Sequence, residues 1–107
     1  MCGIGVILNL AERPLRSLER NLAVINELQA HRGPDGHAIW THARGHVGLA
    51  HRRLSVIDLA TGDQPMEDDA GNWISYNGEI FNYRELREEL GAHTFRTTSD
   101  TEVILRA

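Results

Sequence analysis

Cys2 is the single cysteine of the sequence and directly follows Met1. Small second residues generally permit removal of the initiator methionine, so we expect Cys2 to become the first residue of the mature chain. A terminal cysteine carries a thiol and a free α-amino group, and that amine can take the thiol proton directly or through water. The position therefore predicts a self-activated nucleophile. The alternative is an incidental small apolar residue near a frayed end.

Asn77 and Gly78 lie where a predicted strand passes into a predicted helix. A side-chain amide and a backbone N–H in such a turn can both point at a developing negative oxygen, which is the chemistry of an oxyanion hole. Asn-Gly is also a strong turn dipeptide, and this explains the pair without any catalytic role. The pair by itself leaves both interpretations open.

Two charged positions could bind a small ligand that carries one positive and one negative group. Arg53 adjoins an apolar stretch and could form a two-pronged contact with a carboxylate, although an arginine that extends its charge from a sheet edge looks the same in sequence. Asp100 falls in the first turn of the last predicted helix, where the helix dipole alone favours a carboxylate. The histidine spacings match no common zinc pattern, so no metal site is expected.

Composition narrows the function classes. The chain has 107 residues, of which 41% are hydrophobic and 24% charged, as in soluble globular domains. Lys and Arg number 11 against 15 Asp and Glu, so nothing favours binding to nucleic acid or an anionic membrane. No run of 18 apolar residues predicts a membrane span. The lone cysteine fits a reducing compartment, so we expect a cytoplasmic protein.

The apolar pattern predicts the elements that must position these residues. Strands are expected over residues 3–9, 37–41, 46–51, 54–59, 72–76 and 94–97. Helices are expected over 15–30, over 79–90 and from 99 onward. Ser99 and Glu102 form a capping-box pattern at the start of the last helix. That helix has no terminating signal before Ala107, so we expect the chain to stop inside an element.

Two smaller features complete this set of expectations. Arg44-Gly45 predicts a hairpin turn between two of the strands. Four aromatic residues are expected in the core rather than on a stacking surface: Trp40, Trp73, Tyr76 and Phe81.

Several motifs occur in a fixed order along the whole chain. They are Met1-Cys-Gly-Ile4, His31-Arg-Gly-Pro-Asp-Gly36, Ala50-His-Arg-Arg-Leu-Ser-Val-Ile-Asp58, Gln64-Pro-Met66, Tyr76-Asn-Gly-Glu-Ile-Phe-Asn82 and Thr98-Ser-Asp-Thr-Glu102. Together they resemble the start of the glutaminase domain of glutamine-hydrolysing asparagine synthetases, a class II glutamine amidotransferase domain. The Arg-Gly-Pro-Asp and Arg-Leu-Ser-Val-Ile-Asp segments favour this branch over the sugar-phosphate amidotransferases, which share the terminal cysteine and the Asn-Gly pair.

The resemblance implies an α+β fold, the N-terminal-nucleophile hydrolase sandwich of four α/β/β/α layers with antiparallel sheets. Residues 1–107 would be its N-terminal portion. The family hydrolyses glutamine through a cysteinyl thioester and passes ammonia to a C-terminal synthetase domain, which uses ATP and Mg²⁺ to amidate aspartate. That domain is absent from this sequence, and no cofactor is expected in this segment. The resemblance also allows a homodimer.

The resemblance assigns a role to each motif position. Cys2 would be the nucleophile, and Asn77 with the Gly78 N–H would hold the oxyanion. The glutamine would be bound by Arg53 at its carboxylate and by Glu79 and Asp100 at its ammonium group, in a site lined by Leu54, Ser55, Val56 and Ile57. Two alternatives stay open: a glutaminase that serves a sugar or peptide acceptor, and an inactive truncated remnant.

Overall fold

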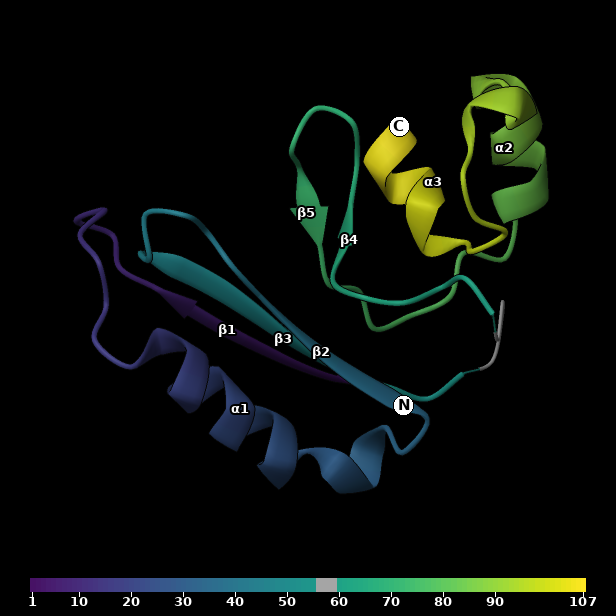
Figure 1. The fold of residues 1–107 in the computed structure, drawn as a ribbon. Coiled ribbons are helices and arrows are strands. Elements are labelled where there is room, and N and C mark those ends of the chain that lie inside the picture. Colours follow the sequence, from purple (N-terminus) through teal and green to yellow (C-terminus); the bar gives the residue numbers. More distant parts are fainter. Residues whose placement is uncertain (56–59) are drawn as a thin grey trace.

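The computed structural model describes residues 1–55 and 60–107. Its largest sheet has three antiparallel strands, β1 (Gly3–Leu8), β2 (Gly36–Thr41) and β3 (Val47–Arg53), in the order β1–β3–β2 (Figure 1). The predicted hairpin turn between β2 and β3 is confirmed, and Gly45 takes the left-handed conformation that it needs, with φ of 68°. Because β3 lies in the middle of this order, it pairs with β1 on one side and with β2 on the other.

One face of this sheet is covered by α1 (Leu18–Leu28), as Figure 1 shows. Leu22 and Ile25 reach the strands closely because glycines lie beneath them. A Cβ atom on Gly48 would fall 2.4 Å from Leu22, and one on Gly5 would fall 2.4 Å from Ile25. The core between the helix and the sheet is formed by Leu18, Leu22 and Ala50, packed against Ile7, Leu15 and Ile39.

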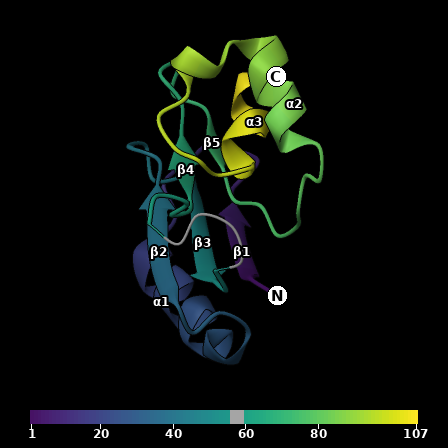
Figure 2. The same ribbon diagram turned by 90° about the vertical axis from the view of Figure 1, so that its right-hand side faces the viewer.

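The opposite face of the sheet carries a short hairpin of β4 (Met66–Glu67) and β5 (Trp73–Ile74) (Figure 2). The rings of Trp40 on β2 and Trp73 on β5 stack with their centroids 4.8 Å apart. His51 on β3 contributes a second contact, because its Nδ1 lies 2.8 Å from the Ser75 hydroxyl just after β5. The two sheets are thus joined by an aromatic stack and a side-chain hydrogen bond.

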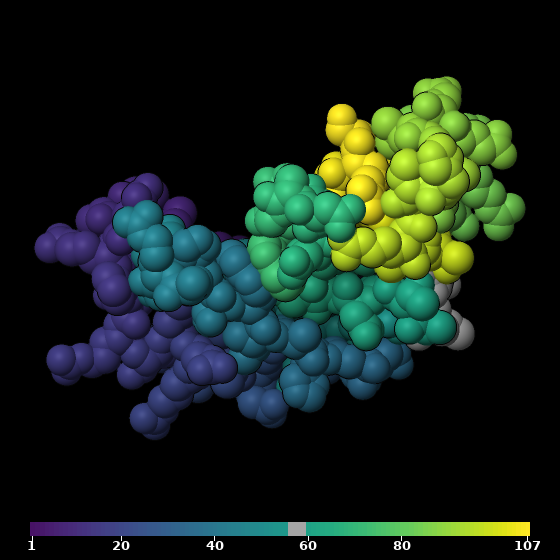
Figure 3. Space-filling view, turned by 45° about the horizontal axis from the view of Figure 1, so that its top comes forward, coloured from purple at the N-terminus to yellow at the C-terminus, as the bar shows by residue number. Residues whose placement is uncertain are grey.

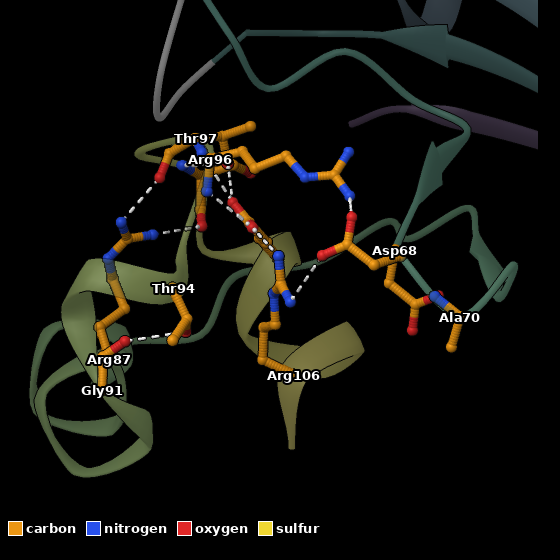
Figure 4. A network of polar contacts seen from close by, with 11 residues as sticks. Asp68, Ala70, Arg87, Gly91, Thr94, Arg96, Thr97 and Arg106 are labelled. Atoms are coloured by element: carbon orange, nitrogen blue, oxygen red, sulfur yellow. Dashed lines mark hydrogen bonds and ion pairs between the residues drawn. The ribbon is translucent and has the colours of Figure 1, made fainter.

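The remaining helices are α2 (Tyr83–Leu90) and α3 (Thr101–Arg106), with single 3₁₀ turns at Ala30–Arg32 and Ala92–Thr94. Figure 3 shows the green and yellow part of the chain, which carries α2 and α3, gathered at one end of the molecule. Two arginines tie the segment between α2 and α3 to its neighbours. Arg87 donates to the Thr97 carbonyl at 2.7 Å (Figure 4), and Arg96 pairs with Asp69.

Most of the predicted elements are confirmed. α1 covers one face of the three-stranded antiparallel sheet, and the two-stranded antiparallel sheet lies on the other face (Figure 1), so the expected α+β class is correct. The expected strand over 94–97 is wrong, because the N–H groups of Arg96 and Thr97 donate to the Glu102 carboxylate instead of to a strand. The same bonds correct the capping-box prediction: Glu102 reaches back past Ser99, while the Ser99 hydroxyl accepts from the Thr101 N–H at 3.2 Å.

The other differences concern the start of α2, the exposure of Phe81, residues 54 and 55, and the strand β4. The helix expected over 79–90 begins only at Tyr83, because the Ile80 N–H is bonded to Asp100. Phe81 is 90% exposed, so its placement in the core was wrong. Residues 54 and 55 form no strand, and the rest of the expected strand over 54–59 lies outside the described residues. β4 was not predicted, since residues 66–67 carry no alternating pattern.

Candidate active site

The register of the large sheet brings the cysteine to the end of β3. Gly3 at the start of β1 pairs with Arg52, so the preceding residue Cys2 lies beside Arg53 and Leu54. The Leu54 N–H donates to Cys2 Sγ at 3.3 Å, and the thiol lies 3.7 Å from the Leu54 carbonyl oxygen. Residues 52 positions apart are therefore held in contact by strand pairing, and the backbone of Leu54, directly after β3, orients the thiol.

Arg32 fixes the same end of the chain from the α1 side. Its Nε donates to the Cys2 carbonyl oxygen at 3.2 Å. The neighbouring Gly33 lets this segment lie directly on β3, because a Cβ there would fall 2.4 Å from the backbone carbon of Arg52. No role was predicted for Arg32, although the Arg-Gly-Pro-Asp motif was a signal that could have identified it.

Arg53 supplies a positive charge that is almost completely buried. Its side chain is 10% exposed, and Nη1 lies 2.9 Å from Oδ1 of Asp63. The Asp63 side chain is 86% exposed, so water stabilises its carboxylate well without the arginine. A ligand carboxylate can therefore replace Asp63 at small cost.

The chain after β5 brings the second group of predicted residues to the same place. Gly78 follows Asn77 in a turn where a Cβ atom would fall 2.5 Å from the hydroxyl oxygen of Tyr76. The position must therefore be glycine while the tyrosine ring stays where it is. Asp100 is buried, and its Oδ2 accepts a hydrogen bond from the Ile80 N–H at 2.8 Å. That bond fixes the loop between the Asn-Gly turn and α2.

Gln64 connects the Asn-Gly turn to the start of α3. Its Oε1 accepts from the Tyr76 N–H at 2.6 Å, and its Nε2 donates to the Thr101 hydroxyl at 3.2 Å. One amide thus holds the residue before Asn77 and the residue after Asp100. No function was predicted for Gln64 either, although the Gln64-Pro-Met66 motif marks its position.

A cavity of about 390 Å³ joins these groups. Seven of the predicted site residues line it: Cys2, Arg53, Leu54, Asn77, Gly78, Glu79 and Asp100. Ser55 is not among the lining residues, and its N–H donates to Asp35 at 2.8 Å. Val56 and Ile57 lie outside the described residues. Segments from the start, middle and end of the chain thus converge on one site.

The charges around the cavity are of both signs. Arg53 faces it from β3, and Glu79 and Asp100 face it from the loop before α2 and from the start of α3. His51, two residues before Arg53, adds no charge. Burial first, and then the positive charge of Arg53, lowers the pKa of His51 from 6.5 to about 4, so the ring is neutral at pH 7.

Among residues 1–55 and 60–107, no group of three or more His, Cys, Asp or Glu side chains could hold a metal ion. In that part of the chain, no helix is long and apolar enough to span a bilayer. What the cavity does present is a thiol, an amide beside a turn N–H, one cation and two carboxylates. Such a set can bind a small zwitterion and attack its carbonyl group.

Comparison with known proteins agrees with this chemistry. Asparagine synthetase [glutamine-hydrolyzing] 1 of Bacillus subtilis (strain 168) is 45% identical over 111 residues, covering 98% of this chain and 17% of the relative. The Sandersonia aurantiaca enzyme of the same name is 45% identical over 105 residues, which is 97% of this chain and 19% of the relative. The chain thus spans less than a fifth of these relatives' length. The family described as the glutamine amidotransferase domain matches residues 1–107, and this chain belongs to it.

Proposed function

We propose that this chain is the glutaminase part of an ATP-dependent asparagine synthetase, which hydrolyses the side-chain amide of glutamine to supply ammonia. The observation that carries the proposal is the convergence of Cys2, Arg53, the Asn77-Gly78 turn and Asp100 on one cavity. The volume of about 390 Å³ suits a free amino acid, being at the small end of ligand pockets.

Glutamine binds through its two charged groups. Its α-carboxylate replaces Asp63 on the buried Arg53 guanidinium, which can donate two parallel hydrogen bonds to a carboxylate. Its α-ammonium group lies toward Glu79 and Asp100 on the other wall. Leu54 lines the cavity between Cys2 and Arg53, so the side-chain amide of the bound glutamine extends past it toward the thiol.

Cleavage then follows acyl-transfer chemistry. After removal of Met1, the α-amino group of Cys2 takes the thiol proton, and Sγ attacks the side-chain carbonyl carbon of glutamine. The negative charge on the carbonyl oxygen is stabilised by the Asn77 amide and the Gly78 N–H. The tetrahedral intermediate collapses with loss of ammonia, which takes the proton from the amine, and leaves a γ-glutamyl thioester. Water then hydrolyses the thioester, releasing glutamate and the free thiol.

The remaining parts of the proposal concern the surroundings of this chain. Residues 1–107 form the N-terminal portion of the glutaminase domain, and ATP and Mg²⁺ bind in a synthetase domain outside this sequence, which receives the ammonia. A nucleophilic thiol must stay reduced, which supports a cytoplasmic setting. Homodimer formation is a prediction that sedimentation of the complete translation product checks.

The experiment compares two nitrogen sources in the complete translation product of the gene. Cys2→Ala should abolish amidation of aspartate with glutamine, since the thioester cannot form, and should leave amidation with added ammonia unchanged. Intact mass measurement establishes whether Met1 has been removed. Glutamine-dependent synthesis that survives Cys2→Ala would refute the proposed nucleophile. Glutamine hydrolysis with no amidation of aspartate by either nitrogen source would refute the acceptor.

A further inference from the structure

We propose that the buried His51–Ser75 hydrogen bond is a positioning contact, which holds the Asn77-Gly78 turn at the distance from Cys2 that glutamine cleavage needs. The inference rests on the proposed function and extends it to two residues that do not touch the substrate. His51 Nδ1 lies 2.8 Å from the Ser75 hydroxyl oxygen. Neither residue lines the cavity formed by the described residues.

The two residues lie just before the two halves of the site along the chain. His51 is on β3, two residues before Arg53 and three before Leu54, whose N–H contacts the thiol. Ser75 directly follows β5 and precedes Asn77 by two residues. The hydrogen bond therefore joins the strand that orients the nucleophile to the segment that carries the oxyanion donors, close to the point where both enter the site.

The surroundings make this contact specific. The His51 side chain is 1% exposed, so water does not compete for the bond. Nε2 is buried too and has no hydrogen-bond partner among the described residues, which leaves Nδ1 as the ring atom that holds the neighbouring segment. The stack of Trp40 on Trp73 fixes β5 on the sheet. A flat stack, however, allows sliding in the plane of the rings that a directional hydrogen bond does not allow.

The effect on catalysis follows from the geometry of the two groups. The oxyanion donors must lie about 2.7–3.1 Å from an oxygen whose carbon is being attacked by the thiol. A misplacement of about 1 Å can reduce the rate about a hundredfold. Binding of glutamine is less sensitive, because Asp100 lies at the start of α3, where Gln64 bonds Thr101 whether or not Ser75 bonds His51. Loss of the bond should therefore lower kcat much more than it raises KM.

The test compares three variants of the complete translation product. Ser75→Ala and His51→Gln both remove the bond, because the glutamine amide lies where Nε2 was. His51→Asn keeps it, since the asparagine amide can occupy the place of Nδ1. We expect a fall of at least tenfold in kcat for glutamine hydrolysis with Ser75→Ala and His51→Gln, and a change in KM below about threefold. His51→Asn should stay within about threefold of the wild type, and alkylation of Cys2 by iodoacetamide should be equally fast in all.

A second measurement does not depend on activity. Amide hydrogen exchange of residues 75–78 should accelerate in Ser75→Ala and His51→Gln and stay slow in His51→Asn. The inference is overturned if folded Ser75→Ala keeps wild-type kcat, if His51→Asn is no better than His51→Gln, or if exchange of 75–78 does not change. A wild-type protein that hydrolyses no glutamine would refute the proposed function, and the exchange comparison would still decide whether this bond holds the turn.

Discussion

Acid should weaken the docking of the β4–β5 hairpin on the large sheet. The loss in unfolding free energy can be calculated from the pKa of His51 in the folded and unfolded chain. In the folded chain the pKa of His51 is lowered to about 4, and in the unfolded chain it has its usual value of 6.5. Well above pH 6.5 the ring is neutral in both states and has no effect on the balance between them. As the pH falls from 6.5 toward 4, the unfolded chain binds a proton that the folded chain does not, so the free energy of unfolding decreases.

The magnitude follows from the difference between the two pKa values. Each unit is worth about 1.4 kcal/mol, so a difference of about 2.5 units gives a loss of at most about 3 kcal/mol between pH 6.5 and pH 4. Below pH 4 the folded state takes up the proton as well, and this contribution stops growing. Proteins of this size are stable by about 5–15 kcal/mol, so the loss is a substantial fraction of the total.

The assay is urea unfolding at a series of pH values, followed by tryptophan fluorescence. The chain has two tryptophans, and Trp40 and Trp73 stack on each other between β2 and β5, so the signal reports on this interface. His51→Asn supplies the control, because it keeps a polar atom for Ser75 and cannot gain a proton. The wild type should lose more stability than the variant between pH 6.5 and 4. Equal losses in the two proteins would refute the burial of a neutral histidine.

Three further predictions test the site and its support. Gly33→Ala should destabilise the chain by about 1–3 kcal/mol in urea unfolding, since its Cβ would fall 2.4 Å from the β3 backbone. Gly36→Ala, whose Cβ would have no neighbour closer than 3.9 Å, should change stability by less than about 0.5 kcal/mol, and equal effects would contradict the packing described. Asn77→Ala should lower kcat for glutamine hydrolysis by about 10²–10³, and an unchanged kcat would exclude the oxyanion role. Arg53→Lys should raise KM for glutamine at least tenfold, since lysine cannot donate two parallel bonds, and an unchanged KM would place the carboxylate elsewhere.

Local chemistry explains why much of this chain could be predicted from its sequence. The apolar stripe of α1, the β-branched run of β1 and the Arg44-Gly45 turn depend on neighbours within a few residues, and all three are confirmed. The predictions failed where a distant side chain takes the backbone hydrogen bonds. Glu102 binds the N–H groups that a strand over 94–97 would use. Asp100 binds the N–H of Ile80, where α2 was expected to have begun already.

The same division holds for the site. The sequence by itself determined which chemical groups are present: a thiol at position 2, an Asn-Gly turn, an arginine beside an apolar stretch and two acidic residues, Glu79 and Asp100. Their meeting is decided only by the tertiary structure, because the β1–β3 register sets Cys2 beside Leu54 and the Gln64 amide links Tyr76 to Thr101. The supporting contacts of Arg32, Gln64 and His51 join residues that lie far apart in the chain. Residue types and spacing do not specify such contacts, since these depend on where strands and loops pack in three dimensions.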